Sequence, residues 1–255
     1  MLTYKCSMKG SEYMDTVKLN NTNVKMIAHR GLSGLECENT AAAFIAAANR
    51  SYYGIESDVH VTADGKFVMH HDDKTGRIFE KDLKIEATSF EKLIALQKKK
   101  DSGKTPESMR RDLVIPTLDD YIDICKRYNK KAILEIKNEF SAENIRKLIR
   151  HIDSYGYLDD TVFISFYWEN LIKLRTFLPN QKVQFLTGSC EGGLTQKLID
   201  HRFDLDILFS GLTSSDVAAL HNAGLEVNCW TVNSVQDAQK MLELGVDYIT
   251  TNILE

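Results

Sequence analysis

Two acidic side chains, Glu56 and Asp58, lie two residues apart within a short apolar run at residues 54–59. Residues two apart in a β-strand point to the same face, so these carboxylates would lie side by side on an otherwise apolar surface. Burying two like charges is costly unless a cation neutralises them. The pair indicates either a divalent-metal site or a solvated strand end, and by itself favours neither.

A third carboxylate, Glu135, lies in the strand-like run at residues 132–137 and shares a face with Lys137. One interpretation is an internal ion pair between these two side chains. The other is that Glu135 meets Glu56 and Asp58 where neighbouring strands end. Three carboxylate oxygens suit Mg²⁺ or Ca²⁺, and the absence of Cys and His at these positions argues against structural zinc. We therefore predict a Mg²⁺ or Ca²⁺ site.

The sequence His29-Arg30-Gly31 follows an apolar run and could bind and activate an anion. A single His is more often structural than catalytic, but an adjacent Arg can bind phosphate through two parallel hydrogen bonds. Gly31 would let the backbone turn close to a ligand. Asn39 and Thr40 precede an Ala-rich segment, and helix capping is the default expectation for both.

Two further histidines, His70 and His71, precede Asp72. Adjacent strand residues face opposite ways, so at most one of the two points at the metal site. Histidine exchanges protons near neutral pH, and two histidines beside a bound phosphate could act as acid and base. The remaining histidines, His60 among them, are expected in helices or loops and receive no role.

The segments that must position these residues alternate between short apolar runs and helix-period stretches. The strands are expected at residues 25–29, 54–59, 131–137, 161–165, 182–186, 205–209, 225–230 and 246–250. The helices are expected at residues 40–50, 118–128, 142–154, 168–177, 195–201, 214–223 and 235–244. This alternation predicts an α/β fold made of parallel βαβ units. We favour a (β/α)₈ TIM barrel over an open doubly wound sheet, because there are eight strands and no Gly-rich dinucleotide turn follows the first.

Two segments depart from the repeat. After the second strand, residues 60–116 contain a probable hairpin with a turn at Asp64-Gly65 and a helix near residues 89–100. Long loops after barrel strands build active sites, so residues 73–116 are interpreted as a small insertion that caps the site. Residues 1–22 form an N-terminal extension of a single barrel domain. Its apolar residues recur partly at helical spacing, which is consistent either with a segment that covers strand surface left bare by a missing last helix or with a disordered tail.

Composition excludes several classes of protein. The net charge is −4 in 255 residues, which gives no reason to expect a nucleic-acid partner. No apolar run is long enough to span a membrane, and the N-terminus lacks the apolar core of a signal peptide. The five scattered cysteines indicate reduced thiols, so a cytoplasmic location is expected.

Together these residues resemble the glycerophosphodiester phosphodiesterase family. The matching stretches occur in the family's order between residues 26 and 252. They are His29-Arg30-Gly31, Glu38-Asn39-Thr40, residues 56–65 running on to His71-Asp72, Ile115-Pro116-Thr117-Leu118, Glu135-Ile136-Lys137, Ile164-Ser165-Phe166, Trp230-Thr231-Val232-Asn233 and Gly245-Val246-Asp247. Each stretch alone is a weak signal, but the ordered set is specific.

The resemblance implies a (β/α)₈ barrel that hydrolyses glycerophosphodiesters, small molecules such as glycerophosphocholine, to an alcohol and sn-glycerol 3-phosphate. Matched by motif, the residues with implied roles are the metal ligands Glu56, Asp58 and Glu135, the catalytic histidines His29 and His71, the phosphate contacts Arg30 and Lys137, and Trp230 and Phe166 as walls of the substrate site. The order of acid and base, and the choice between attack by water and by the glycerol 2-hydroxyl, stay open.

This chain departs from the family at two places. Cys37 stands where the family often has Pro, and only three residues follow Thr250-Thr251-Asn252, where the family usually has Thr-Asp and a final helix. Two alternatives to the main hypothesis are a lysophospholipase D acting on a lipid with one acyl chain, and a non-catalytic barrel that binds phosphodiesters. The polar insertion argues against the first, and the matched histidines argue against the second.

Overall fold

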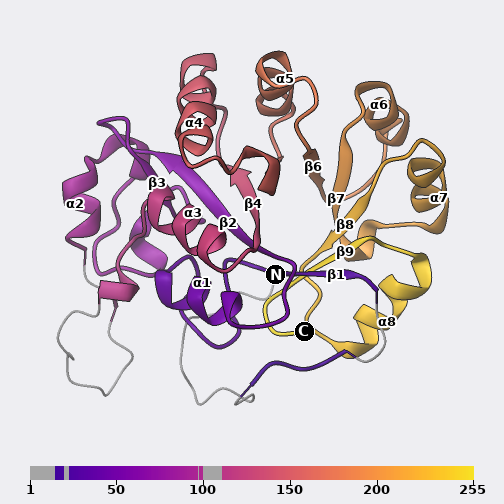
Figure 1. Cartoon of the computed structure of the whole chain (residues 1–255), viewed down its shortest axis with the longest axis horizontal. Helices are drawn as coiled ribbons and strands as arrows, with labels where there is room; N and C mark the ends of the chain where they lie inside the picture. The colour runs from indigo at the N-terminus through magenta and orange to yellow at the C-terminus, as the bar shows by residue number, and fades with distance from the viewer. Residues whose placement is uncertain (1–14, 20–22, 97, 100–110) are drawn as a thin grey trace.

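The computed structural model describes residues 15–19, 23–96, 98–99 and 111–255. Eight parallel strands in this part of the chain form a closed barrel, and helices surround it (Figure 1). The barrel strands are β1 (Lys25–Ala28), β2 (Gly54–Val61), β4 (Lys131–Ile136), β5 (Thr161–Ser165), β6 (Val183–Thr187), β7 (Asp204–Leu208), β8 (Val227–Trp230) and β9 (Tyr248–Thr251). Each pairs with its neighbour, and β1 pairs with both β2 and β9, which closes the sheet. The predicted TIM barrel is confirmed.

The helices lie close to their expected positions. They are α1 (Ala41–Ala48), α2 (Phe90–Ile94), α3 (Leu118–Arg127), α4 (Ala142–Ser154), α5 (Trp168–Phe177), α6 (Leu194–His201), α7 (Ser214–Asn222) and α8 (Val235–Leu244). Local chemistry sets several of their ends. Thr117 and Asp120 form a capping box at the start of α3, while Ser234 caps α8 and Gly245 ends it in a left-handed conformation. Polar caps therefore allow short loops between strands and helices.

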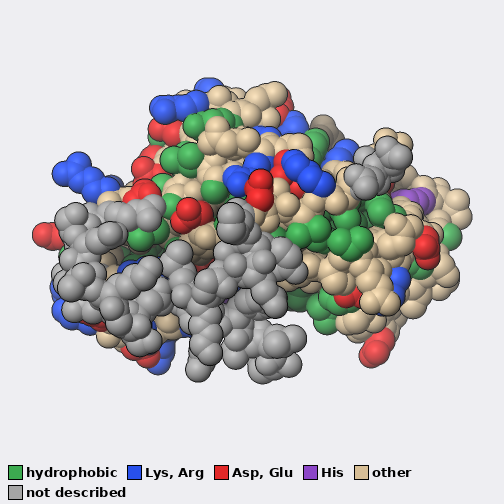
Figure 2. Space-filling model, turned by 90° about the horizontal axis from the view of Figure 1, so that it is seen from below, with side chains coloured by type: hydrophobic (Ala, Val, Ile, Leu, Met, Phe, Trp, Pro, Cys, Tyr) green, Lys and Arg blue, Asp and Glu red, His purple; other side chains and the backbone are tan. Residues whose placement is uncertain are grey.

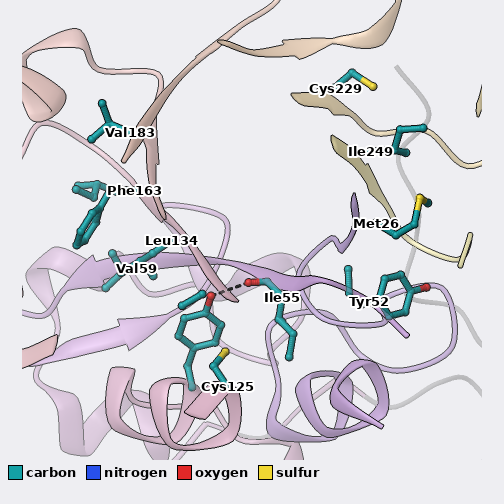
Figure 3. Packing of buried hydrophobic residues seen from close by; sticks show 14 of the residues in the cluster. Met26, Tyr52, Ile55, Val59, Cys125, Leu134, Phe163, Val183, Cys229 and Ile249 are labelled. Carbon is teal, nitrogen blue, oxygen red and sulfur yellow. Dashed lines mark hydrogen bonds between the residues drawn. The ribbon is translucent and has the colours of Figure 1, made fainter. Parts of the chain in front are cut away.

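The hydrophobic core has two layers, one between the barrel and the helices and one inside the barrel. Figure 3 shows part of the outer layer, where Val59, Leu134 and Phe163 project from neighbouring strands. The hydroxyl of Tyr121 donates to the Ile55 carbonyl over 2.7 Å and ties α3 to β2. The inner layer contains Ile27, Ile133, Val162, Ile164, Leu186 and Tyr248. Alternate residues along each strand pack in the outer and in the inner layer. The next inward-facing positions after Ile27 on β1 and Ile133 on β4 therefore lie at the mouth of the barrel.

The expected hairpin is present and starts the insertion. Strand β3 (Phe67–Met69) pairs antiparallel with the end of β2. Three short 3₁₀ turns follow around α2: η1 (Thr75–Arg77), η2 (Ile85–Ala87) and η3 (Arg111–Leu113). Helix α2 is much shorter than the expected residues 89–100, because the chain leaves the helix after Ile94 and Lys98 instead bridges to Phe79. Most of the lysine-rich stretch at residues 98–104 lies outside the described residues.

The insertion has its own small core and lies beside β3 and α3, on one side of the barrel (Figure 1). Its buried apolar side chains are Cys37, Val68, Ile78, Phe79, Ile85, Leu93, Leu96 and Ile115. These residues include Cys37 from the barrel's first loop and Val68 from β3. The insertion is therefore fixed to the first and second βα connections, next to the residues expected to bind phosphate.

The end of the chain packs against the described part of the N-terminal extension. Residues 252–255, which follow β9, form no helix; instead Leu254 bridges to Val17, whose amide donates to the Ile253 carbonyl over 3.0 Å. Val17 and Leu19 pack on the main core, and the Glu255 carboxylate accepts hydrogen bonds from Thr16 and Ser51. Residues 15–19 are thus extended rather than helical, and the other residues of the extension lie outside the described part.

The coloured part of the face in Figure 2 carries Lys and Arg side chains interspersed with Asp and Glu. No continuous band of one charge is visible on it, which agrees with the small net charge of −4. Among the helices in the described ranges, none combines the length and apolar character needed to cross a membrane.

Candidate active site

The barrel brings the three predicted metal ligands together. Glu56 and Asp58 both point inward from β2, and Asp58 is the register neighbour of Glu135 on β4. One carboxylate oxygen from each residue lies within 4.8 Å of the other two, and all three side chains are buried. Glu56, Asp58 and Glu135 therefore form a compact cluster of oxygen ligands.

The cluster buries three acidic groups of like charge beside one another. Burial, followed by the charges of Asp58 and Glu135, raises the pKa of Glu56 well above its ordinary value. Burial and then Asp58 raise the pKa of Glu135 to about 7. Burial would also raise the pKa of Asp58, but Lys137, the other nearby positive charges and the Asn39 hydrogen bond together hold it well below the usual range. A divalent cation would relieve the repulsion that raises two of these three pKa values.

The Lys137 ammonium contacts two of the three carboxylates. Its ammonium is 2.8 Å from Glu135 Oε1 and 3.3 Å from Asp58 Oδ1. Burial would lower the pKa of Lys137, but these two carboxylates raise it above its ordinary value. The internal ion pair considered from the sequence is therefore present. Lys137 therefore lies beside the acidic cluster.

Arg30 connects the first loop to the same cluster. Its backbone amide donates to Glu56 Oε2 over 2.8 Å, and its Nε lies 3.9 Å from Asp58 Oδ2. The backbone there is left-handed, with φ of 55° at Arg30 and 74° at Gly31. A Cβ atom on Gly31 would lie 2.6 Å from the Ala43 carbonyl carbon of α1, so only glycine lets this turn pack against the helix.

His29 is partly buried between the first and last strands. Its Nδ1 is 2.7 Å from Asn252 Oδ1, which also accepts a hydrogen bond from the Ser33 hydroxyl over 2.9 Å. Its Nε2 lies 3.9 Å from Glu56 Oε2. Burial, and then the Arg30 charge, lower the pKa of His29 to about 3. The ring is therefore neutral and keeps one nitrogen toward the acidic cluster.

The two adjacent histidines follow the end of β3 and have different surroundings. His70 is buried, packs on Phe79 with ring centroids 5.9 Å apart, and has Nε2 3.3 Å from the Lys74 carbonyl. His71 is partly exposed, and its Nδ1 is 2.7 Å from Asp72 Oδ1. The charge of His71 contributes to lowering the pKa of Asp58, so this ring lies near the cluster.

Sequence reasoning assigned Asn39 to helix capping, and that assignment is wrong. Thr40 caps α1 by accepting from the Ala43 amide, whereas Asn39 Nδ2 donates to Asp58 Oδ2 over 2.7 Å. Its Oδ1 accepts from the Ser57 hydroxyl over 2.6 Å. Asn39 is turned inward by a left-handed backbone with φ of 51°. The sequence signal for this role was the Glu-Asn-Thr triplet, one of the matched family stretches.

Several other residues around the site had no assigned role. Asp72 and Asn252 hold the two histidines, and Glu38 accepts from Arg30 Nη1 over 2.9 Å. Asp206, on β7, faces into the barrel with no hydrogen-bond partner for Oδ1 among the described residues. Burial, and then Glu135, raise the pKa of Asp206 well above its ordinary value. Glu38 and Asp72 lie in the matched family stretches, which gave them no role, and nothing in the pattern set Asp206 and Asn252 apart from ordinary surface or capping residues.

The expected wall residues lie together at the far side of the barrel mouth. Phe166 follows β5 and Trp230 ends β8, and their rings meet edge to face with centroids 5.7 Å apart. Trp230 Nε1 donates to the Asp206 carbonyl over 3.3 Å, while Phe166 is 46% exposed. This aromatic pair faces solvent and can contact the organic part of a substrate.

His60 was expected outside the strands, and that expectation is wrong. It lies in β2, two residues after Asp58, and is fully buried. Burial lowers its pKa to about 4, so the ring is neutral. The strand runs longer than the apolar pattern indicated, because β3 pairs with residues 59–61 and extends it.

This arrangement defines a class of protein: a (β/α)₈ barrel with a buried carboxylate cluster, two histidines and an arginine at the carboxyl ends of its strands. Such a site can bind a divalent cation and a phosphate group together. Similarity to known proteins agrees with this chemistry. Residues 29–255 match the profile of the Glycerophosphoryl diester phosphodiesterase family.

Individual relatives and solved structures extend over most of the chain. Glycerophosphodiester phosphodiesterases of Bacillus altitudinis and Caldanaerobacter subterraneus are each 28% identical over 234 residues; the alignments cover 89% of this chain and 94% and 93% of those proteins. An Oleispira antarctica phosphodiesterase, solved in complex with the product sn-glycerol-3-phosphate, has a TM-score of 0.80 and 24% identity, covering 89% of this chain and 92% of that one. A glycerophosphodiester phosphodiesterase from Parabacteroides distasonis has a TM-score of 0.75 and 25% identity, covering 93% and 94%.

The chain belongs to the glycerophosphoryl diester phosphodiesterase family. It is a glycerophosphodiester phosphodiesterase, and the resemblance recognised from the ordered motifs is confirmed. The alternative of a non-catalytic binding barrel is set aside by this membership.

Proposed function

We propose that this enzyme converts glycerophosphodiesters to an alcohol and sn-glycerol 3-phosphate at a divalent metal held by Glu56, Asp58 and Glu135. The observation that carries the proposal is the buried cluster of three carboxylates, with oxygens within 4.8 Å of one another. The repulsion within it, seen in the raised pKa values of Glu56 and Glu135, fits a site built for a cation. When bound, Mg²⁺ or Ca²⁺ would polarise the phosphate and offset negative charge in the transition state.

The protein's own cations would orient the phosphate. Arg30 Nε lacks a hydrogen-bond partner among the described residues and can donate to a phosphate oxygen. The Arg30 backbone is fixed by the hydrogen bond that its amide donates to the Glu56 carboxylate, so the guanidinium starts from a set position. Lys137 lies on the other side of Asp58 and would supply a second positive charge. Together they would hold the diester with its scissile bond over the cluster.

His29 and His71 would move the protons. One imidazole takes the proton of the nucleophile, which is water or the glycerol 2-hydroxyl, and the other gives a proton to the leaving alcohol. With the hydroxyl as nucleophile, the first step forms a cyclic phosphate, and water then opens it to glycerol phosphate. Support for this pairing comes from the two rings lying near the same carboxylates, each with Nδ1 held by a side-chain oxygen.

The organic part of the substrate would meet the aromatic pair Phe166 and Trp230. Phe166 is 46% exposed, so its ring can lie against a glycerol backbone without having to move. The Oleispira antarctica relative binds sn-glycerol-3-phosphate as its product, which supports the same product here.

A lysophospholipase D activity is less well supported. Acceptance of an acyl chain calls for a wide apolar surface on the cap, in addition to the aromatic pair at the site. The large apolar side chains exposed in the described part of the chain are Ile45, Phe166, Tyr167 and Val235, and none belongs to the insertion. The apolar residues of the insertion are instead buried in its own core.

A substrate panel tests the proposal. Glycerophosphocholine, glycerophosphoethanolamine and a lysophospholipid would each be incubated with the enzyme, and the products would be identified by ³¹P NMR. We expect glycerol 3-phosphate from the first two and little or no turnover of the lipid. Preferential hydrolysis of the lysophospholipid would replace the proposed substrate class with the alternative.

We also propose a cytoplasmic location. Cys37, Cys125 and Cys229 are buried free thiols, as expected in a reducing compartment. Cell fractionation with an antibody to the chain would test this, and recovery outside the cytoplasmic fraction would refute it.

A further inference from the structure

We propose that Arg77, in the insertion, is a positioning residue that fixes both His71 and Arg30 through the two carboxylates between them. The proposal rests on the proposed function, since it assigns Arg77 a role through the residues expected to move protons and bind phosphate. Arg77 is the last residue of η1. Neither motif analysis nor the proposed reaction gives it a part.

The first arm of the link runs to His71. Arg77 Nε donates to Asp72 Oδ2 over 2.5 Å, and Asp72 Oδ1 lies 2.7 Å from His71 Nδ1. Burial would raise the pKa of Asp72, but the hydrogen bonds from His71 and Arg77 hold it well below its usual range. An ionised carboxylate only accepts hydrogen bonds, so His71 Nδ1 must carry the hydrogen. Nε2 is then the nitrogen left for substrate.

The second arm runs to Arg30. Arg77 Nη1 and Nη2 donate to Glu38 Oε2 and Oε1 over 2.8 and 2.7 Å, forming a two-pronged pair. Glu38 Oε1 also accepts from Arg30 Nη1 over 2.9 Å. Burial would raise the pKa of Glu38, but Arg77 and then Arg30 lower it to about 2. Glu38 is therefore a fixed anion between two guanidinium groups, and Arg77 limits how far it and Arg30 can turn.

Arg77 itself projects from a rigid turn. Thr75 anchors η1 by donating its hydroxyl to the Lys81 carbonyl over 2.6 Å, and its amide donates to the Leu83 carbonyl over 3.0 Å. The next two residues, Ile78 and Phe79, are buried in the core of the insertion. The insertion thus supplies a clamp on the first two loops of the barrel. Lysine could not replace Arg77, because one ammonium lacks the planar fork that reaches both carboxylates.

The two arms predict different kinetic effects. Asp72→Asn should lower mainly kcat, because it disturbs the proton position on His71, whereas Glu38→Gln should mainly raise KM through Arg30. Arg77→Ala should do both and reduce kcat/KM by about 10- to 100-fold, the scale expected when support away from the chemistry is lost. Arg111→Ala, an exposed arginine of the same insertion, is the matched control and should have no effect on kcat/KM.

A double-mutant cycle distinguishes positioning from simple support of the fold. Arg77→Ala would be measured in the wild type and in the Asp72→Asn/Glu38→Gln background, with the melting temperature recorded for each variant. If Arg77 acts through these carboxylates, its removal from the second background should change kcat/KM by no more than about twofold. An equal loss in both backgrounds would overturn the proposal.

An NMR measurement on ¹⁵N-histidine protein provides a readout that needs no turnover. Without Arg77, the Asp72 carboxylate is no longer held against His71 and can turn away from it. His71 should therefore have its hydrogen on Nδ1 in the wild type and a mixture of tautomers in Arg77→Ala, while the signal of His29 stays the same. An unchanged His71 tautomer in Arg77→Ala would overturn the link. If the wild type failed to hydrolyse glycerophosphodiesters while the tautomer still shifted, the proposed function would fall and the positioning of His71 would stand.

Discussion

His29 and His71 are the same residue type at the same site, yet different parts of the molecule hold them. His29 is the more buried of the two and is hydrogen-bonded to Asn252, a neutral amide that follows the last barrel strand. His71 is partly exposed and bonded to Asp72, a carboxylate that the insertion holds through Arg77. One histidine therefore depends on closure of the barrel, and the other on an insertion with its own core.

In the proposed reaction, this difference would let a barrel place two proton-transfer groups on one substrate. The strands set the carboxylates rigidly, because Asp58 and Glu135 are register neighbours. The histidines come from loops, and each needs a partner that fixes the ring. If this account is correct, changes near Asn252 and changes near Arg77 should damage the enzyme separately.

The largest separable effects should come from the histidines themselves. His29→Ala and His71→Ala should each reduce kcat by about 10²–10⁴-fold, because each removes one proton-transfer step. A p-nitrophenyl diester, whose leaving group needs no proton, should recover part of the loss only in the variant that lacks the acid. Steady-state kinetics with both substrates would assign the two roles.

His70→Ala is the control for this pair. It removes a ring packed on Phe79 in the insertion, so it should cost far less in kcat than His71→Ala. A larger loss for His70 would mean that the strand register assigned to these residues is wrong.

Much of this arrangement follows from the sequence, and the part that does not has a physical reason. The barrel and the meeting of Glu56, Asp58 and Glu135 followed from strand periodicity, because side chains alternate faces regularly along a strand. Asn39 and Arg77 did not, because their positions depend on a left-handed backbone and on a separately folded turn. His60 was misplaced because pairing with β3 lengthens β2 beyond its apolar run.

The packing that closes the barrel beside Asn252 can be weakened without changing the surroundings of His71. Deleting residues 1–20 would remove Val17 and Leu19 from the core surface and the Val17–Leu254 bridge beside Asn252. We expect a lower melting temperature, by roughly 2–4 °C for each kcal/mol lost. Thermal unfolding of the truncated and full chains would measure it, and equal melting temperatures would show that the segment adds nothing to closure.

Because the carboxylates of the cluster titrate, the stability that the fold gains from a bound metal should depend on pH. The folded-state pKa of Glu135 is raised to about 7 from 4.5, so its contribution to metal-free stability is complete below about pH 4.5 and is lost as the pH rises through about 7. Binding a cation requires the ionised form. The rise in melting temperature on adding Mg²⁺ or Ca²⁺ should therefore be larger at pH 8 than at pH 5.

Glu135→Gln is the control for this pH effect, because it removes the titrating group. Its melting temperature should respond little to either metal at both pH values. An equal metal-induced rise at pH 5 and pH 8 in the wild type would contradict the link between Glu135 ionisation and metal binding.

The smallest effect is expected far from both histidines. Tyr121→Phe removes the hydrogen bond to the Ile55 carbonyl but keeps the ring packed on Phe44. It should lower the free energy of unfolding by about 1 kcal/mol and leave kcat unchanged. Urea unfolding and the standard assay would test both parts, and a loss of kcat would show that the site is coupled to the outer core.

The central claim is that both histidines act on a phosphate bound at a metal held by Glu56, Asp58 and Glu135. Its most direct test is turnover of glycerophosphocholine after exhaustive chelation, followed by return of Mg²⁺ or Ca²⁺. Chelation should abolish turnover, and the returned metal should restore it in the wild type but not at the same concentration in Glu56→Gln. Full activity in the chelated wild-type enzyme would contradict the claim.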